Sequence, residues 1–413
     1  MNDYDRGVIR SLLLKKGFEE VAKPEESNFV IYLTCAVRKH AEQRALGRIR
    51  SEGNGKVKVV AGCLARMYGE KLIKEGMADI VIGPDSYRNL PFLLQRHIRE
   101  GLPEIDIENR LDSYEDILPI FRENNFSRYI TIMRGCNNFC SYCIVPYVRG
   151  SERFKPQDSI LKEVRKAVEE GVVEVFLLGQ NVLAYRDKEI GFTQLLEKVS
   201  QIKGLRRVGF LTSHPKDMSD ELIEKLLRIE NLVRYFHIPL QSGSERILKK
   251  MNRRYTPEYY LEIIESIRKR FKDPFISTDI IVGFPGETEE DFKETIEMVK
   301  RIEFDFAYMF AYSERPFTKA CKMGPKVDEK TKKERLSYLI EIQNTITRKK
   351  VRSLLGKTEK VLSFGRAKRG GTLTKSLNNR IVVVEEDIEP KREVFIKIEK
   401  INGWTPIGRL KWE

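Results

Sequence analysis

The chain has little cysteine, histidine or tryptophan, and it has no long apolar run. Six cysteines, four histidines and two tryptophans occur among 413 residues. No segment approaches the roughly twenty apolar residues that a membrane-crossing helix needs, and residues 1–5 do not resemble a signal peptide. We therefore expect a cytoplasmic protein without a membrane segment, whose few cysteines bind metal rather than form disulfides.

Length and charge indicate several domains and a polyanionic partner. A chain of 413 residues is too long for one ordinary core and predicts two or three domains. The net charge is +14, and residues 341–413 carry 17 Lys and Arg against 9 Asp and Glu. A basic terminal segment is typical of nucleic-acid binding. A solvated surface rich in Lys and Glu, as in thermophiles, explains the charge equally well.

Three of the six cysteines lie within eight residues, at Cys136, Cys140 and Cys143, with the spacing C-x3-C-x2-C. Thiolates suit zinc and iron–sulfur clusters. Structural zinc takes four protein ligands, and no fourth Cys or His follows nearby. Three thiolates around a four-iron cluster leave one iron open to a cofactor. Adjacent core cysteines are the alternative, but the polar Gly, Asn and Ser of this loop favour a cluster.

The surrounding string resembles a known family. With Tyr142 before its last cysteine, the motif resembles the signature of radical S-adenosylmethionine enzymes. Residues 135–150, Gly-Cys-Asn-Asn-Phe-Cys-Ser-Tyr-Cys-Ile-Val-Pro-Tyr-Val-Arg-Gly, resemble the methylthiotransferases, and among them the MiaB-type enzymes that modify tRNA. The resemblance implies three domains: a methylthiotransferase N-terminal α/β domain (1–105), a radical-SAM core (122–350) and a TRAM RNA-binding domain (353–413).

The first hundred residues alternate strand and helix. Buried-strand runs at 29–34, 57–61 and 78–82 are separated by helical segments, which predicts a parallel sheet covered on both faces. Cys35 and Cys63 each follow such a strand. Ligands bind at this edge of open α/β sheets, so the two thiols could converge. Before any family is considered, metal binding and a structural role are equally supported.

By resemblance, Cys35 and Cys63 are the second and third ligands of a second cluster. The first ligand would lie in a Gly-Cys-Gln-Met-Asn string that ends the first strand of the sheet. Residues 1–5, Met-Asn-Asp-Tyr-Asp, resemble the tail of that string, and the sheet opens on a helix at 8–16. We therefore predict that the true start lies upstream. In-frame Gly-Cys-Gln codons should precede the first codon.

The middle of the chain predicts a partial barrel. Polar residues 101–125 without a clear period predict a linker. Six strand runs then alternate with helical runs, at 129–133, 172–178, 207–211, 235–240, 275–282 and 305–310. Six β/α units predict a parallel barrel or partial barrel, and the resemblance implies a partial (β/α)6 radical-SAM barrel.

Polar and glycine residues follow the strand runs, where parallel barrels bind ligands. They could also be ordinary turns and caps, the reading we favour for Ser242, Ser244 and Thr288. The resemblance assigns S-adenosylmethionine binding to a set of strand-end residues, with a guanidinium gripping the carboxylate. These are Tyr142, Gly179, Gln180, Ser213, Gln241 and Arg254.

Three nearby residues receive separate interpretations. We expect His214 to position groups rather than act as a base, because radical hydrogen abstraction needs no base. Cys321 is interpreted as a free structural thiol. The family pattern Arg-Pro-Gly-Thr is Arg-Pro-Phe-Thr here, so Phe317 is a departure from it.

The last segment predicts an RNA-binding barrel. A charged helix from 328 to about 354 precedes strand runs at 359–364, 380–384 and 393–398, typical of a small β-barrel. The resemblance implies an OB-like TRAM domain. Salt-dependent contacts to the tRNA backbone are then expected from Arg149, Arg366, Lys368, Arg369, Lys375 and Arg380.

Taken over the whole chain, the resemblance implies a methylthiotransferase acting on N6-(dimethylallyl)adenosine beside the tRNA anticodon. It implies two [4Fe-4S] clusters, S-adenosylmethionine, an electron donor such as flavodoxin or ferredoxin, and a sulfur donor. We expect a monomer that binds the anticodon stem-loop. The alternatives are threonylcarbamoyl-adenosine or a ribosomal-protein aspartate as substrate, an RNA-binding radical-SAM protein without sulfur insertion, and a ferredoxin-like carrier.

Overall fold

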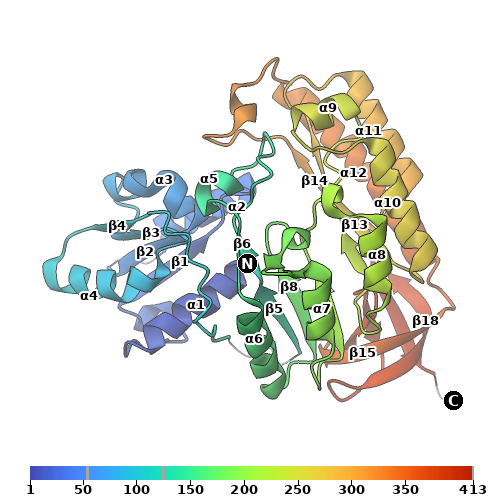
Figure 1. The fold of residues 1–413 in the computed structure, drawn as a ribbon, viewed down its shortest axis with the longest axis horizontal. Coiled ribbons are helices and arrows are strands. Elements are labelled where there is room, and N and C mark those ends of the chain that lie inside the picture. The colour runs from blue at the N-terminus through green and yellow to red at the C-terminus, as the bar shows by residue number, and fades with distance from the viewer. Residues whose placement is uncertain (53–54, 122–125, 412–413) are drawn as a thin grey trace.

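The computed structural model describes residues 1–52, 55–121 and 126–411. Figure 1 shows the N-terminal sheet and its helices on the left, the core strands and helices in the middle and right, and a C-terminal barrel below them. The described residues contain no helix that is both long and apolar enough to cross a membrane. The predicted α/β fold class, with its parallel sheets and small terminal barrel, is confirmed.

The N-terminal sheet is parallel, in the order β1-β2-β3-β4. Its strands are β1 (Phe29–Thr34), β2 (Val57–Gly62), β3 (Ile80–Ile82) and β4 (Glu104–Asp106). Helices α1 (Asn2–Leu14) and α4 (Leu90–Glu100) pack on one face, and α2 (Lys39–Ser51) and α3 (Cys63–Lys74) on the other. In β2, Val59 and Ala61 face the first pair while Val60 faces the second, the two-residue period of a strand buried on both faces.

The segment predicted as a linker is partly structured. It contains β4, and Tyr114 and Ile117 pack in the core beneath α1 and α4. The Tyr114 hydroxyl donates to the Pro84 carbonyl at 2.9 Å and accepts from the Tyr87 N–H at 3.0 Å. A linker is therefore wrong for residues 104–117, because two apolar anchors three residues apart are too few to show a period. Residues 122–125 lie outside the described residues.

The core has the six predicted parallel strands, in chain order. They are β5 (Ser127–Thr131), β8 (Glu174–Leu178), β11 (Arg207–Phe210), β12 (Tyr235–His237), β13 (Phe275–Val282) and β14 (Phe306–Ala311). The first three form one sheet and the last three another, joined by a bridge between Val208 and Leu232. The helices of the core are α6 (Gln157–Glu169), α7 (Phe192–Ser200), α8 (Asp220–Leu227), α9 (Glu245–Lys250), α10 (Pro257–Arg270) and α11 (Glu289–Ile302).

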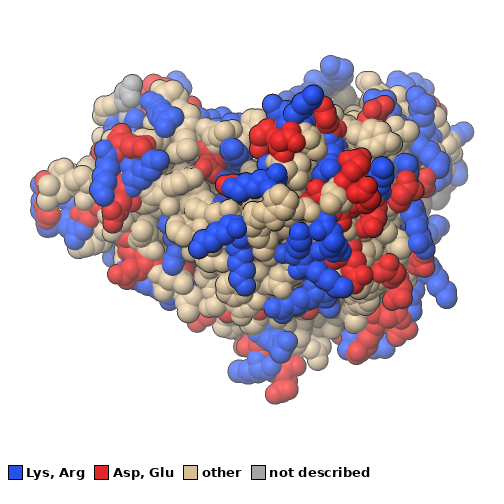
Figure 2. Space-filling view, turned by 90° about the horizontal axis from the view of Figure 1, so that it is seen from above, with Lys and Arg blue, Asp and Glu red and all other residues tan. Residues whose placement is uncertain are grey.

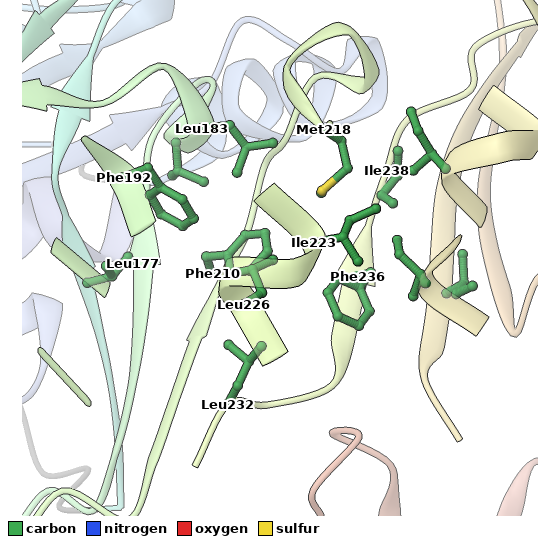
Figure 3. Close-up of a cluster of buried hydrophobic side chains, with 14 of the residues drawn as sticks. Leu177, Leu183, Phe192, Phe210, Met218, Ile223, Leu226, Leu232, Phe236 and Ile238 are labelled. Carbon is green, nitrogen blue, oxygen red and sulfur yellow. The ribbon is translucent and has the colours of Figure 1, made fainter. Parts of the chain in front are cut away.

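Apolar side chains between strands and helices hold the core together. Figure 3 shows Leu177 of β8, Phe192 of α7 and Phe210 of β11 in this cluster. The rings of Phe192 and Phe210 meet edge to face at 5.1 Å between centroids. Truncating such a buried ring costs about 3–5 kcal/mol. Short pairs complete the core: β6 (Met133–Arg134) with β7 (Arg153–Phe154), and β9 (Arg186–Asp187) with β10 (Ile190–Gly191).

The C-terminal barrel is closed by five strands, two more than predicted. After α12 (Glu329–Arg352) come β15 (Thr358–Arg366), β16 (Thr372–Ser376), β17 (Ile381–Val384), β18 (Glu393–Asn402) and β19 (Thr405–Leu410), closing as β15-β16-β17-β19-β18. Strand β16 escaped prediction because its buried positions are Thr372, Thr374 and Ser376, which bond within the barrel instead of forming an apolar face.

The barrel docks on the amino ends of the core strands. Lys375 pairs with Glu174, the first residue of β8, at 2.7 Å. The Arg207 guanidinium of β11 donates to the Lys375 carbonyl at 2.7 Å. Arg380 pairs with Asp305, just before β14, at 2.9 Å. The opposite, carboxyl end of the core strands is thus left for other contacts.

Candidate metal and cofactor site

The three-cysteine loop follows the first core strand, at the carboxyl end. Gly135 opens the loop with φ +76°, and a Cβ there would lie 1.9 Å from the Ser151 carbonyl oxygen, so only glycine fits. Asn138 Nδ2 lies 3.5 Å from Cys136 Sγ, and Arg253 Nη1 lies 3.4 Å from Cys140 Sγ. The loop therefore presents its sulfurs in a buried setting with two nitrogen donors.

Burial governs the chemistry of these thiols. Together with the neighbouring Cys140, it raises the pKa of Cys136 and raises the pKa of Cys143 to about 12. The three side chains are thus within electrostatic reach of one another. Thiolates would need nearby positive charge, which bound iron and the Arg253 guanidinium supply.

The three thiols of the loop are soft ligands of the kind that bind iron–sulfur clusters. Within the described residues, no three His, Cys, Asp or Glu side chains are grouped so that they could hold one metal ion. A four-iron cluster needs three thiolates spread around a larger body, and soft sulfur ligands suit it. The residues present therefore fit the cluster that the loop sequence predicts.

Buried polar atoms without a hydrogen-bond partner surround the mouth of the core barrel. Gln180 Oε1, His214 Nε2 and Gln241 Oε1 are such atoms, and they follow three successive core strands. A buried polar group left unpaired is costly, so these atoms fit a polar ligand such as S-adenosylmethionine. Gly179 leaves no room for a side chain, because a Cβ would lie 2.3 Å from Met133 Cγ. Ser213 Oγ instead donates to the His237 carbonyl at 2.7 Å.

The arginine that reaches the cluster loop is Arg253, which sequence reasoning missed. It is buried, and its Nη2 donates to the Pro239 carbonyl at 3.0 Å. Arg254, predicted to bind the carboxylate of S-adenosylmethionine, is exposed with φ +55°. Two adjacent arginines cannot be told apart by composition. Tyr255, whose hydroxyl accepts from Arg253 Nε at 3.1 Å, is the one local signal for the buried member.

His214 is held in its neutral form. Burial lowers its pKa to about 2, assisted by the charges of Arg253, Lys216 and Arg254. Its Nδ1 accepts from the Lys216 N–H at 3.3 Å. Such a histidine cannot become an acid in the neutral pH range, in keeping with the positioning role expected of it.

The second pair of cysteines lies at the carboxyl ends of β1 and β2. The register pairs Thr34 with Gly62, which brings Cys35 and Cys63 to neighbouring positions. Arg149 Nε lies 3.2 Å from Cys63 Sγ. Burial raises the pKa of Cys63, and the Arg149 charge opposes this. The structure thus brings the two predicted ligands together.

Comparisons with known proteins agree with this arrangement. A model of the Radical SAM superfamily matches residues 130–299, and a model described as Uncharacterized protein family UPF0004 matches residues 1–83. A protein of Thermoanaerobacter sp. (strain X514), named tRNA-2-methylthio-N(6)-dimethylallyladenosine synthase, is 41% identical over 99% of this chain and 90% of its own length. A synthase of the same name from Thermodesulfovibrio yellowstonii is 40% identical over 99% and 96%.

The chain belongs to this synthase family. The radical S-adenosylmethionine methyltransferase TsrM from Kitasatospora setae, solved with cobalamin and a [4Fe-4S] cluster, shares the fold with a TM-score of 0.58 at 14% identity. The match covers 77% of this chain and 74% of that one. The cobalamin-dependent radical enzyme OxsB matches with a TM-score of 0.52 at 13% identity, over 83% and 55%.

Within this synthase-family chain, Arg149 is not placed to contact RNA, which corrects the prediction. Its side chain is buried, and Nη2 pairs with Asp5 at 2.8 Å. The other Asp5 oxygen pairs with Arg134, two residues before Cys136, at 2.6 Å. Burial alone would raise the pKa of Asp5, but the two guanidinium groups outweigh it and lower that pKa. Asp5, which sequence reasoning missed, therefore ties the two cysteine sites together.

The predicted RNA contacts of the terminal barrel divide into two groups. Lys375 and Arg380 are taken up by the docking ion pairs, so the prediction that they contact tRNA is corrected. Arg366, the last residue of β15, is exposed, as are Lys368 and Arg369 between β15 and β16. Figure 2 views the side where α5 (Val145–Arg149) and α9 lie, and Lys and Arg gather across its middle.

Proposed function

We propose that this protein adds a methylthio group to C2 of N6-(dimethylallyl)adenosine next to the anticodon of tRNA. The observation that carries the proposal is the Asp5 bridge between two cysteine sites, one beside a barrel mouth with unpartnered polar atoms. A reaction with two cluster chemistries on one base needs both sites held at a fixed separation. The names of the relatives supply the substrate.

We assign one [4Fe-4S] cluster to Cys136, Cys140 and Cys143, and a second to a site that includes Cys35 and Cys63. Tyr142, Gly179, Gln180, Ser213 and Gln241 form the proposed S-adenosylmethionine site, with Arg254 at its exposed edge. When bound, the first cluster and S-adenosylmethionine supply hydrogen-atom abstraction, and the second cluster supplies sulfur.

The chain's own residues hold and shield these groups. Arg253 donates to Cys140 and fixes the cluster loop against the Pro239 carbonyl. Gln180 and Gln241 offer carbonyl oxygens to ligand donors. Neutral His214 offers Nε2 without adding charge. Enclosing the mouth keeps water and wrong hydrogens away from a reactive radical.

We further propose three domains with the predicted bounds 1–105, 122–350 and 353–413, with the last as the RNA-binding part; Tyr114 and Ile117, between the first two, pack with the first. The protein's proposed partners are the anticodon stem-loop, an electron donor such as flavodoxin or ferredoxin, and a sulfur donor. The protein would act as a monomer in the cytoplasm.

Anaerobic reconstitution followed by nucleoside mass analysis tests the proposal. The reconstituted chain, given S-adenosylmethionine and a reductant, should convert a stem-loop carrying dimethylallyl-adenosine to its methylthio form. A stem-loop carrying threonylcarbamoyl-adenosine is the control and should stay unchanged. About eight irons per chain should accompany activity, as two four-iron clusters require. About four irons, with S-adenosylmethionine cleavage but no methylthio product, would contradict sulfur insertion by this chain.

A further inference from the structure

Phe317 occupies a backbone conformation that phenylalanine disfavours. Its φ is +69°, in the left-handed region, and 61% of its surface is exposed. Glycine would adopt the same backbone without strain. A bulky side chain with positive φ costs free energy, and such strain is retained where it serves function. The ring is therefore better explained by a contact outside the chain than by packing.

A second exposed phenylalanine lies across a tyrosine from it. Phe139, in the cluster loop, has φ +47° and is 46% exposed. The ring of Tyr147 lies 6.4 Å from that of Phe139 and 6.4 Å from that of Phe317, measured between centroids. We call Phe139, Tyr147 and Phe317 the aromatic rim.

The rim lies between the two cysteine loops. Phe139 directly precedes Cys140, and Tyr147 packs against the apolar cluster that contains Cys63. The loop of Phe317 reaches the other site too: the Arg315 guanidinium donates to the Val37 carbonyl, two residues past Cys35, at 3.2 Å. The rim residues therefore belong to loops that adjoin both cysteine sites.

Exposed basic residues follow the loops of Cys35 and Phe317 in the sequence, and the Arg38 guanidinium lies over the Tyr308 and Phe310 rings. Arg38 and Lys39 follow the Cys35 loop, Lys319 and Lys322 follow Phe317, and all four are exposed. Figure 2 shows Lys and Arg gathered on the face where α5, which carries Tyr147, lies. Aromatic faces beside positive charge are what proteins use to bind single-stranded nucleic acid.

We propose that the aromatic rim is a stacking platform for an unpaired base of the tRNA anticodon loop that neighbours the modified adenosine. This inference rests on the proposed function and names the contact that presents the RNA. An electron-donor protein could also meet apolar and basic residues. The position between both cysteine loops favours RNA, because a donor needs to approach only one of the clusters.

The test compares strain and RNA binding in the full chain. Phe317→Gly removes the ring and relieves the strain, whereas Phe317→Tyr keeps a ring. Leu111→Gly is the matched control, because Leu111 is also exposed and apolar with φ +53° but lies outside the rim. The Kd for a fluorescent anticodon stem-loop carrying dimethylallyl-adenosine is measured at one salt concentration, with the melting temperature alongside.

We expect Phe317→Gly to weaken RNA binding about fivefold or more, as losing one stacked base does. Its melting temperature should rise by about 2–4 °C through strain relief, as it should in Leu111→Gly. Leu111→Gly and Phe317→Tyr should bind RNA as the unaltered chain does. An unchanged Kd of Phe317→Gly for the stem-loop overturns the inference. It does so even if this variant binds flavodoxin more weakly. If the unaltered chain fails to bind the stem-loop, the proposed function falls first and the inference with it.

Discussion

The carboxyl and amino ends of the core barrel differ in what their charged and polar side chains contact. At the carboxyl end, residues in the left-handed region crowd the strand ends and loops: Phe139, Thr212, Gln241, Asn252, Arg254 and Phe317. At the amino end, charged groups such as Lys375 and Arg380 are paired across the docking surface of the terminal barrel. Left-handed residues also occur at the amino end, at Asp273, Glu303 and Asn379. What distinguishes the amino end is therefore the set of ion pairs that holds the terminal barrel against the core strands.

Arginine shows the difference most clearly. Arg149 and Arg253 at the carboxyl end lie against cysteine sulfurs, while Arg207 and Arg380 at the amino end bind carbonyls and carboxylates. The first pair contacts thiols in addition to the Asp5 carboxylate and the Pro239 carbonyl, whereas the second pair contacts no cysteine among the described residues. Sequence composition treats the four alike.

The largest effect is expected from removing one thiol of the first cluster site, at the carboxyl end of the core strands. Cys136→Ser should abolish S-adenosylmethionine cleavage and lower the iron content by about four per chain, because the first cluster loses one of its three thiolate ligands. Iron and sulfide analysis with product chromatography measures both. Cys321→Ser, outside both sites, is the control and should keep full iron content. Retained cleavage in Cys136→Ser would contradict the assignment of this ligand.

The second-largest effect is expected from removing the Asp5 carboxylate, which pairs with both Arg134 and Arg149. Asp5→Asn leaves Arg134 and Arg149 buried without their counter-charge, and breaking a buried pair costs about 3–5 kcal/mol. Urea denaturation measures the free energy of unfolding. Asp3→Asn in the same helix is the matched control, because its pair with Arg6 is exposed and worth about 0–1 kcal/mol.

The loss of unfolding free energy in Asp5→Asn should depend on pH. Two guanidinium groups lower the pKa of Asp5 in the folded state, against the burial that would raise it. The stability that this carboxylate contributes is therefore full above its unfolded pKa of about 4 and is lost as pH falls through the folded value. The difference in unfolding free energy between the unaltered chain and Asp5→Asn should shrink below about pH 4. A difference that grows there would contradict the sign.

A smaller effect is expected at the amino end. Arg380→Met leaves the buried Asp305 without one of its partners, at a cost of about 1–3 kcal/mol, while Lys350 still pairs with it at 3.3 Å. Iron content and S-adenosylmethionine cleavage should stay unchanged, since this end carries none of the proposed ligands. Loss of cleavage without loss of folding would show that the two ends are coupled.

The exposed turn of the terminal barrel should give the smallest change in stability. Replacing Arg366, Lys368 and Arg369 with Gln should alter the unfolding free energy by less than about 0.5 kcal/mol. The slope of log affinity for tRNA against log salt should fall by about one for each phosphate that the turn no longer neutralises. Lys360→Gln, on β15 away from this turn, is the control; Lys360 is paired with Glu393, as Arg366 is with Asp387. An unchanged salt slope in the triple variant would remove this turn from the RNA-binding surface.

Much of the fold was predictable from local sequence pattern. The sequence alone determined the cysteine loop, the six β/α units and strands such as 29–34 and 275–282, because spacing and apolar periods are properties of neighbours in the chain. Tertiary structure alone decided that Asp5 joins Arg134 to Arg149, that Arg253 rather than Arg254 meets Cys140, and that Lys375 faces the core instead of RNA. The roles of these side chains depend on partners that are distant in sequence. Charge or composition at one position does not show which distant group will neutralise it.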